Sequence, residues 1–303
     1  MMKLQTRRAF LETSAGLMGL AALNPLLKGN KRSEKLAFST LGCPDWSLKQ
    51  IVDCSVENDY KGFEIRGLAG EMDLPKCPEF SKTNLPASLR MIKDNDLKII
   101  NLGSSANLHF AHEDKRKSNL DDAKRFIDLA EQLHCPFVRV FPDDLPPNQS
   151  VEQTLDLIIS GLITLGEYAK GSNVTILLES HGKVVYKDML LKIMSGANHP
   201  KVGLIWDFFN MWVITKESPK EVFDTLGKYI KHVHVKDARI IDNKPAYCLI
   251  GEGVAPLKET MDSLKNGQYK GYYSFEWEKK WHPEIQDPEI AFPHFAKEIY
   301  KYL

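Results

Sequence analysis

The stretch that decides the fold is VEQTLDLIISGLITLGEYAKGSNVTILLESH, residues 151–181. In its first part, Val151–Lys170, apolar residues recur at alternating steps of three and four, the spacing of one face of an α-helix. These residues are Leu155, Ile158, Leu162, Leu165 and Ala169. Its second part, Thr175–Ser180, is a short apolar run that ends in polar residues, as buried strands do. The stretch therefore predicts a helix followed by a strand.

The same alternation of strand-like and helix-like sequence extends along most of the chain. Eight strand-like runs are each followed by sequence with helical periodicity, including helices expected within Asn119–Leu133 and Asp287–Tyr302. The eight runs are Leu36–Cys43, Gly62–Gly67, Lys98–Ser105, Phe137–Pro142, Thr175–Ser180, Val202–Asp207, Ile230–Asp237 and Gly271–Trp277. Such alternation implies parallel strands joined by helices, and eight is the number that closes a barrel.

A doubly wound open sheet is the alternative arrangement of the same elements. Against it, no Gly-x-Gly-x-x-Gly motif follows the first strand, and Gly251-Glu252-Gly253 comes only after the seventh. No linker rich in Pro, Gly or Ser divides the chain into halves. We therefore predict an α/β protein with one domain, a (β/α)8 TIM barrel over residues 31–303.

The N-terminal segment Met1–Asn30 is predicted to be an export signal with a short linker. It contains Thr6-Arg7-Arg8-Ala9-Phe10-Leu11, followed by a weakly apolar stretch from Ala15 to Leu27. A paired-arginine segment before a short apolar one resembles a twin-arginine signal, which predicts a periplasmic protein. A surface amphipathic helix is the alternative interpretation.

The charge balance points away from nucleic acid. The 303 residues hold 40 Lys+Arg and 40 Asp+Glu, a formal net charge of zero. Residues 1–27 carry Lys3, Arg7 and Arg8 against Glu12, a net charge of +2, which leaves the remainder at −2. An apurinic-site endonuclease would need a basic groove, so we exclude nucleic acid as a partner. Nothing after residue 30 approaches a transmembrane run, so we expect no stable membrane insertion of the mature protein.

The five cysteines show neither a zinc motif nor a disulfide framework. They are scattered with no C-x-x-C spacing, and their odd number leaves at least one thiol unpaired. Their positions are Cys43, Cys54, Cys77, Cys135 and Cys248.

Residues that bind metals stand at the ends of strands five to eight, where such barrels place their chemistry. These residues are Glu179, Asp207, His234 and Glu276. Side chains alternate between the two faces of a strand, and the residues on the face opposite these four, such as Leu178, Val233 and Val235, are large and apolar. Because the apolar face meets the helices, the four polar side chains are predicted to converge at the barrel axis.

Three converging carboxylates repel one another, and a divalent cation resolves that repulsion. Oxygen-rich ligation with a single imidazole favours Mn²⁺ or Mg²⁺, with Co²⁺ or Zn²⁺ as alternatives. We therefore predict one divalent metal ion. The alternative is that each residue is an ordinary polar strand end that caps a neighbouring loop.

Five motifs resemble the xylose isomerase-like barrels of the sugar phosphate isomerase/epimerase superfamily. They are residues 178–182 (LESHG), 202–207 (VGLIWD), 232–237 (HVHVKD), 251–253 (GEG) and 274–276 (SFE), and the resemblance covers nearly all of the chain from Leu36. It implies metal ligation by the same four residues and, since members often dimerise, a homodimer. It also implies a carbohydrate isomerase or epimerase that works through a metal-stabilised enediolate, with Glu179 and Glu276 as the catalytic acid/base pair.

One position departs from the superfamily pattern. Many members have a histidine three residues after the aspartate of strand six, where this chain has Asn210. Asparagine exchanges hydrogen bonds but does not shuttle protons near neutral pH. The metal ligands are unaffected, whereas the simplest substrate assignment does not carry over to this chain.

Further residues are predicted to bind substrate. Asn210 and three residues that follow the metal-binding strands, His181, Lys236 and Arg239, could contact substrate oxygens; solvated loop positions are the alternative for the last three. Glu64 and Arg139, on strands two and four, either line the cup or pair with each other inside the barrel.

Two other functions remain open from the sequence. A leaving group β to the carbonyl would turn the same machinery into a metal-dependent lyase or dehydratase acting on a keto-sugar, keto-glycoside or keto-inositol. A non-catalytic carbohydrate-binding barrel is the third reading, suggested by Asn210 and by the lack of a dedicated base beyond the metal ligands.

Overall fold

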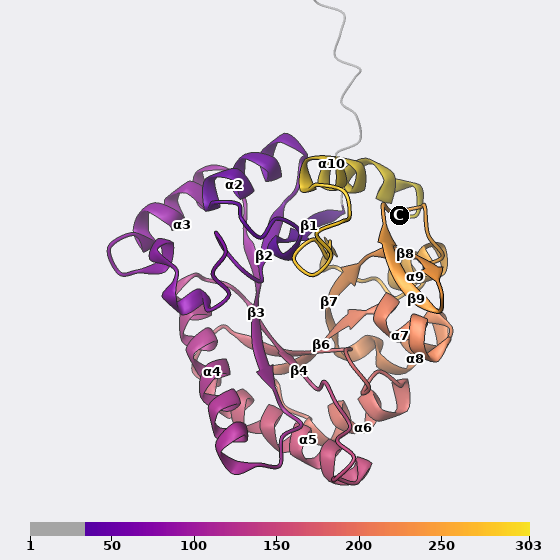
Figure 1. The fold of residues 1–303 in the computed structure, drawn as a ribbon. Helices are drawn as coiled ribbons and strands as arrows, with labels where there is room; N and C mark the ends of the chain where they lie inside the picture. The colour runs from indigo at the N-terminus through magenta and orange to yellow at the C-terminus, as the bar shows by residue number, and fades with distance from the viewer. Residues whose placement is uncertain (1–33) are drawn as a thin grey trace, which may run out of the picture. The chain divides into compact units, whose positions relative to one another are not determined.

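The structure, a computed structural model, describes residues 34–303 and confirms the predicted single-domain (β/α)8 barrel. Eight parallel strands close in the order β1-β10-β7-β6-β5-β4-β3-β2 (Figure 1). Their bounds are β1 Lys35–Ser39, β2 Gly62–Ile65, β3 Ile99–Asn107, β4 Phe137–Phe141, β5 Thr175–Glu179, β6 Val202–Asp207, β7 Ile230–Val235 and β10 Tyr272–Phe275.

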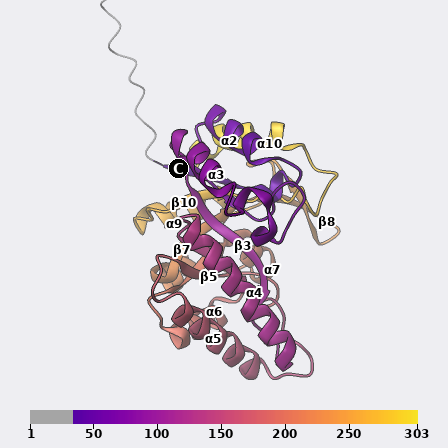
Figure 2. The same cartoon turned by 90° about the vertical axis from the view of Figure 1, so that its left-hand side faces the viewer.

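Helices cover the outside of this barrel, and α4 packs along β3 (Figure 2). The helix expected within Val151–Lys170 is α5, Val151–Tyr168, which begins where the Ser150 side chain accepts a hydrogen bond from the Gln153 amide. The other helices are α2 Leu48–Glu57, α3 Leu85–Asp94, α4 Glu113–Gln132, α6 Lys187–Ala197, α7 Phe208–Thr215, α8 Pro219–Leu226, α9 Leu257–Asn266 and α10 Pro288–Glu298. Short 3-10 turns lie at Thr40–Gly42, Leu74–Lys76, Pro78–Phe80, Gly227–Tyr229 and Ile299–Lys301.

Alternation along the strands separates an apolar outer layer from a polar interior. On β5, Ile176 and Leu178 belong to the hydrophobic core between strands and helices. On β7, Val233 and Val235 do the same, whereas His234 contacts acidic side chains from other strands. The outward residues thus pack against the helices, and the inward residues line the interior of the barrel, where they can form a site.

The seventh expected strand ends earlier than predicted, because a different element begins there. The run Ile230–Asp237 contains β7 only as far as Val235, and Asp237 begins a separate antiparallel hairpin. This hairpin, β8 Asp237–Ile241 and β9 Lys244–Cys248, lies outside the barrel wall (Figure 1).

Asp237 ties the loop after this hairpin to its first strand. Its Oδ1 accepts hydrogen bonds from the amides of Ala238 at 2.9 Å and Ala255 at 3.0 Å. Its Oδ2 accepts from the amides of Gly251 and Gly253, both at 3.0 Å. A Cβ at position 253 would lie 2.2 Å from Asp237 Oδ1, so this close approach requires glycine. The aspartate and the GEG motif therefore form one structural unit.

We expect Asp237→Asn to lower the free energy of unfolding by about 2–3 kcal/mol, because an amide nitrogen would face two amide donors. Urea denaturation followed by circular dichroism measures the change. Asp242→Asn is the matched control, since Asp242 is exposed at the hairpin tip. A loss no larger than that of the control would contradict the role of Asp237.

The five cysteines are buried free thiols, all within the described residues 34–303. Burial raises the pKa of Cys54, Cys77 and Cys135 to about 12 and that of Cys248 to about 11. Burial also raises the pKa of Cys43 well above its ordinary value.

Because the thiolate is the reactive form, we expect native thiols at pH 8 to react with iodoacetamide about 100-fold more slowly than an ordinary cysteine, or slower still. Mass spectrometry should find five modified cysteines only after unfolding in guanidinium. Rapid labelling of the native protein would show that the thiols are accessible.

No helix within residues 34–303 combines the length and the apolar character that a membrane span requires. The predicted export signal and the domain boundary at residue 31 lie outside the described residues and remain predictions.

Candidate functional site

Four side chains predicted to converge do lie together at the carboxyl ends of β5, β6, β7 and β10. Glu179, Asp207, His234 and Glu276 each offer one atom within 4.8 Å of those of the others, and all four residues are buried. His234 Nδ1 lies 3.3 Å from Glu276 Oε1, 3.5 Å from Glu179 Oε1 and 3.9 Å from Asp207 Oδ2. The four strands therefore direct one nitrogen and three carboxylates to a common point.

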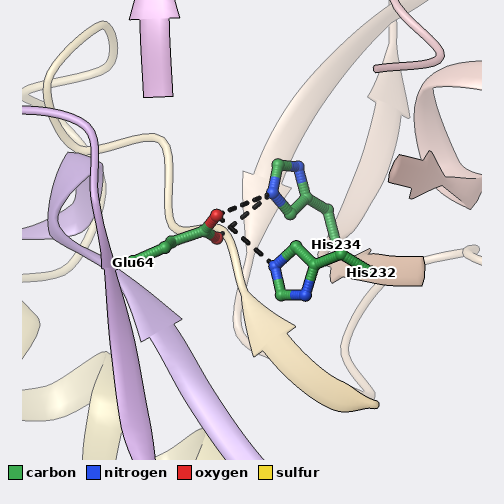
Figure 3. A group of neighbouring side chains, drawn as sticks. All are labelled: Glu64, His232 and His234. Carbon is green, nitrogen blue, oxygen red and sulfur yellow. Dashed lines mark hydrogen bonds and ion pairs between the residues drawn. The ribbon is translucent and has the colours of Figure 1, made fainter. Parts of the chain in front are cut away.

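Glu64 on β2 orients the imidazole of His234 (Figure 3). Both carboxylate oxygens of Glu64 lie 3.1 Å from His234 Nε2, and His232 Nε2 lies 3.4 Å from Glu64 Oε2. Ser274 Oγ donates to Glu64 at 2.6 Å and Asn101 Nδ2 at 2.9 Å. Burial opposes ionisation of Glu64, but the two histidines lower its pKa well below the ordinary value. A carboxylate so placed fixes the hydrogen on His234 Nε2 and turns Nδ1 toward the acids.

The donor set fits a divalent cation. His234 Nδ1 is buried and makes no hydrogen bond within the described part of the chain, although it faces three carboxylates. Burial disfavours a charged His234, yet Glu276, Glu64 and Glu179 raise its pKa well above the ordinary value. The surrounding carboxylates thus favour a positive charge at this point, and a metal ion with an oxygen-rich ligand set would supply it.

Two buried cations hold the carboxylates of the catalytic candidates. Arg139 Nη1 donates to Glu179 Oε2 at 2.7 Å; despite burial, this guanidinium lowers the pKa of Glu179 to about 2. Lys236 Nζ donates to Glu276 Oε2 at 2.5 Å and to Glu278 Oε1 at 2.6 Å. Burial would raise the pKa of Glu276, but His234 and Lys236 lower it well below the ordinary value. Both glutamates are therefore ionised at neutral pH.

Asp207 has a different environment. Its Oδ1 accepts a hydrogen bond from the Asn210 amide at 2.8 Å, so the carboxylate caps α7, and its Oδ2 lies 2.8 Å from Lys236 Nζ. Burial, opposed by Lys236 and reinforced by Glu276 and Glu179, raises the pKa of Asp207 to about 7. Of the three carboxylates, Asp207 is the one whose ionised form its surroundings stabilise least, so a further positive charge would stabilise it most.

A cavity of about 300 Å³ opens onto this cluster. Of the predicted substrate-binding residues, Arg139, His181, Asn210 and Lys236 line it, as do both Glu179 and Glu276. His181 Nδ1 pairs with Asp143 at 2.9 Å; burial disfavours the charged imidazole, but Asp143 and Glu179 raise the pKa of His181.

Two predicted substrate residues lie elsewhere. Glu64 is buried beneath the cluster, where it binds histidines, and Arg239 is exposed on β8 and pairs with Glu252 at 2.8 Å. Neither lines the cavity. The alternative that Glu64 pairs with Arg139 is wrong, because Arg139 pairs with Glu179 and Glu64 with His232 and His234.

Sequence reasoning missed several residues of the cavity wall. These are Leu41, Arg66, Phe141 and Tyr247; Glu278 and Trp281, from the loop after the last strand, complete the wall. Arg66 directly follows β2 and Phe141 ends β4, so the rule that selected strand ends five to eight would have found both if applied to every strand. No such signal marks Tyr247, because its hairpin was not predicted.

Comparison with known proteins identifies the family. The profile of the family described as "Xylose isomerase-like TIM barrel" matches residues 53–293. A solved structure of the IOLI protein with a bound zinc atom superposes with a TM-score of 0.72 over 89% of this chain and 99% of its own. At 20% sequence identity, that likeness shows the fold alone.

Curated relatives include both an isomerase-type enzyme and a lyase-type enzyme. Fructoselysine 3-epimerase of Shigella flexneri is 24% identical over 183 residues, which are 57% of this chain and 64% of the relative. Inosose dehydratase of Geobacillus thermodenitrificans is 28% identical over 159 residues, 47% of this chain and 51% of the relative. The chain thus spans less than two thirds of the length of either relative.

Proposed function

Because the chain belongs to the xylose isomerase-like TIM barrel family, we propose that it is a metal-dependent carbohydrate isomerase or epimerase. The observation that supports this proposal most directly is the placement of Glu179 and Glu276 on separate walls of one cavity, each paired with a buried cation. The match to an epimerase that acts on fructoselysine supports the same class of reaction.

The proposed chemistry is removal and return of a proton beside a sugar carbonyl. Glu179 and Glu276 reach the cavity from β5 and from the end of β10, with β6 and β7 between them. Arg139 and Lys236 keep these carboxylates in the form that accepts a proton. In an epimerase one carboxylate takes the proton from one face of the substrate and the other returns it to the opposite face.

The ligands of the proposed metal are Glu179, Asp207, His234 and Glu276. A divalent ion bound there would supply Lewis acidity, which makes a proton next to a carbonyl easier to remove. The zinc atom in the IOLI structure supports a divalent ion in this fold, and the oxygen-rich donor set favours Mn²⁺ or Mg²⁺.

A dehydratase is the second candidate. Lys236 lines the same cavity and carries a proton next to Glu276, so it could donate that proton to a departing hydroxyl. The match to inosose dehydratase favours this reading. The two reactions share proton abstraction and differ in the fate of the group β to the carbonyl.

The test combines metal analysis with turnover in D₂O. After supplementation with Mn²⁺ and desalting, we expect about one equivalent of bound metal; less than about 0.2 equivalents would contradict both enzymatic readings. The metal-loaded protein is then incubated with D-tagatose, D-fructose and 2-keto-myo-inositol and followed by NMR. Solvent deuterium in an isomeric product supports the isomerase or epimerase, and loss of water supports the dehydratase. Metal-independent sugar binding without exchange or elimination would instead indicate a carbohydrate-binding barrel.

A further inference from the structure

We propose that Arg66 binds an anionic group of the substrate, a carboxylate or a phosphate, and that the substrate is therefore an acidic sugar derivative. This inference rests on the proposed function, because it places the substrate in the cavity of about 300 Å³ that Arg66 lines together with Glu179 and Glu276.

Arg66 is the cation of the cavity wall that lacks a carboxylate partner. Three fixed cations line the cavity, and Arg139 and Lys236 are each paired with glutamates. No ion pair joins Arg66 to any acid of residues 34–303; its Nη2 donates to Ser105 Oγ at 3.0 Å and its Nη1 to the Gly103 carbonyl at 3.4 Å. These neutral contacts position the guanidinium without neutralising it.

The backbone at Gly103 leaves room for the guanidinium of Arg66 beside that of Arg139. A Cβ at position 103 would lie 2.7 Å from Arg66 Cδ and 3.1 Å from Arg139 Nη2, so glycine leaves room for both side chains over β3. Arg139 stacks on the Phe141 ring at 3.8 Å, and its Nε is buried with no hydrogen-bond partner in the described chain. The two guanidinium groups thus lie side by side, and of the two only that of Arg139 forms an ion pair, with Glu179.

A substrate anion would supply the ion-pair partner that Arg66 lacks among residues 34–303. Burial and the neighbouring Arg139 lower the pKa of Arg66 to about 9, which still leaves it charged at neutral pH. A half-buried guanidinium with unused donors matches the planar, bidentate geometry of a carboxylate or phosphate group. The cavity admits one small molecule, so that anion and the reacting carbonyl belong to the same ligand.

The test measures binding to Mn²⁺-loaded protein by isothermal titration calorimetry. The probes are D-fructose, D-fructuronate and D-fructose 6-phosphate, which share a keto-sugar and differ in charge. We expect at least one anionic sugar to bind about 10-fold or more tightly than D-fructose. The anionic sugar that binds more tightly assigns the group as carboxylate or phosphate.

Variants assign the preference to this residue. Arg66→Gln should weaken binding of the anionic sugar about 10- to 100-fold and leave the affinity for D-fructose nearly unchanged, whereas Arg66→Lys should retain part of the preference. Arg239→Gln removes the same charge outside the cavity and should behave as wild type. Equal affinity of the wild type for neutral and anionic sugars, or a preference that survives in Arg66→Gln, would overturn the proposal.

Inorganic phosphate separates this proposal from the proposed function. It is titrated into EDTA-treated wild-type and Arg66→Gln proteins, in which no metal can hold it. If no sugar binds but phosphate binds only to the wild type, the anion site stands and the proposed function fails. If no sugar binds and phosphate binds both proteins alike, or neither, Arg66 is not an anion site.

Discussion

Replacing Lys236 with methionine is expected to lower the free energy of unfolding of the metal-free protein by about 3–5 kcal/mol, because removing one partner leaves buried charges uncompensated. The ammonium lies within 2.8 Å of oxygens from Asp207, Glu276 and Glu278. Methionine has a similar length and no charge, so packing is largely kept while three carboxylates lose their shared cation.

Guanidinium denaturation in EDTA measures this loss. Lys231→Met is the matched control, since Lys231 lies on the same strand β7 but is exposed. Adding Mn²⁺ should recover part of the lost stability, because an ion that binds only the folded protein stabilises it by mass action. A change below about 1 kcal/mol in EDTA would show that the acids do not depend on Lys236.

Replacing Glu276 or Glu179 with glutamine is expected to reduce kcat/KM by about 10²–10⁴-fold, the usual contribution of a general acid or base. Each glutamine keeps the shape of the side chain but cannot accept the substrate proton. Each also weakens metal ligation, so the affinity for Mn²⁺ must be measured by calorimetry and activity compared at saturating metal.

Glu252→Gln serves as the control for these two variants, because Glu252 is an acid at the same end of the barrel that pairs with Arg239 outside the cavity. Deuterium incorporation into the substrate, followed by NMR, reports the proton transfer directly. If either cavity variant exchanges deuterium as fast as the control at saturating Mn²⁺, that glutamate does not move the proton.

The barrel and the convergence of four side chains were accessible to sequence reasoning because both follow from short-range rules. Alternation along a strand determines which face Glu179 or His234 occupies. Eight strand–helix units predict that the sheet closes into a barrel. Neither rule needs knowledge of distant contacts. The position of a side chain along its strand therefore predicted its neighbours at the barrel end.

Long-range partners could not be predicted in the same way. Glu64 lies 170 residues from His234 in the chain, and its choice of partner depends on which inward side chains are long enough to meet beneath the cluster. The hairpin was missed because β8 and β9 are short and only partly buried, so they lack a regular apolar alternation. Because the hairpin was missed, neither the place of Tyr247 in the cavity wall nor the four hydrogen bonds of Asp237 could be predicted.

That hairpin has a consequence for how this barrel could diversify. Both of its ends are fixed at Asp237, while Asp242 and Asn243 form its tip at positive φ and Tyr247 on β9 reaches the cavity. Residues near the tip can therefore be lengthened or exchanged without unseating a barrel strand. The hairpin can therefore be replaced as a unit. Evolution or an engineer can change the cavity wall through it while Glu179 and Glu276 keep their positions.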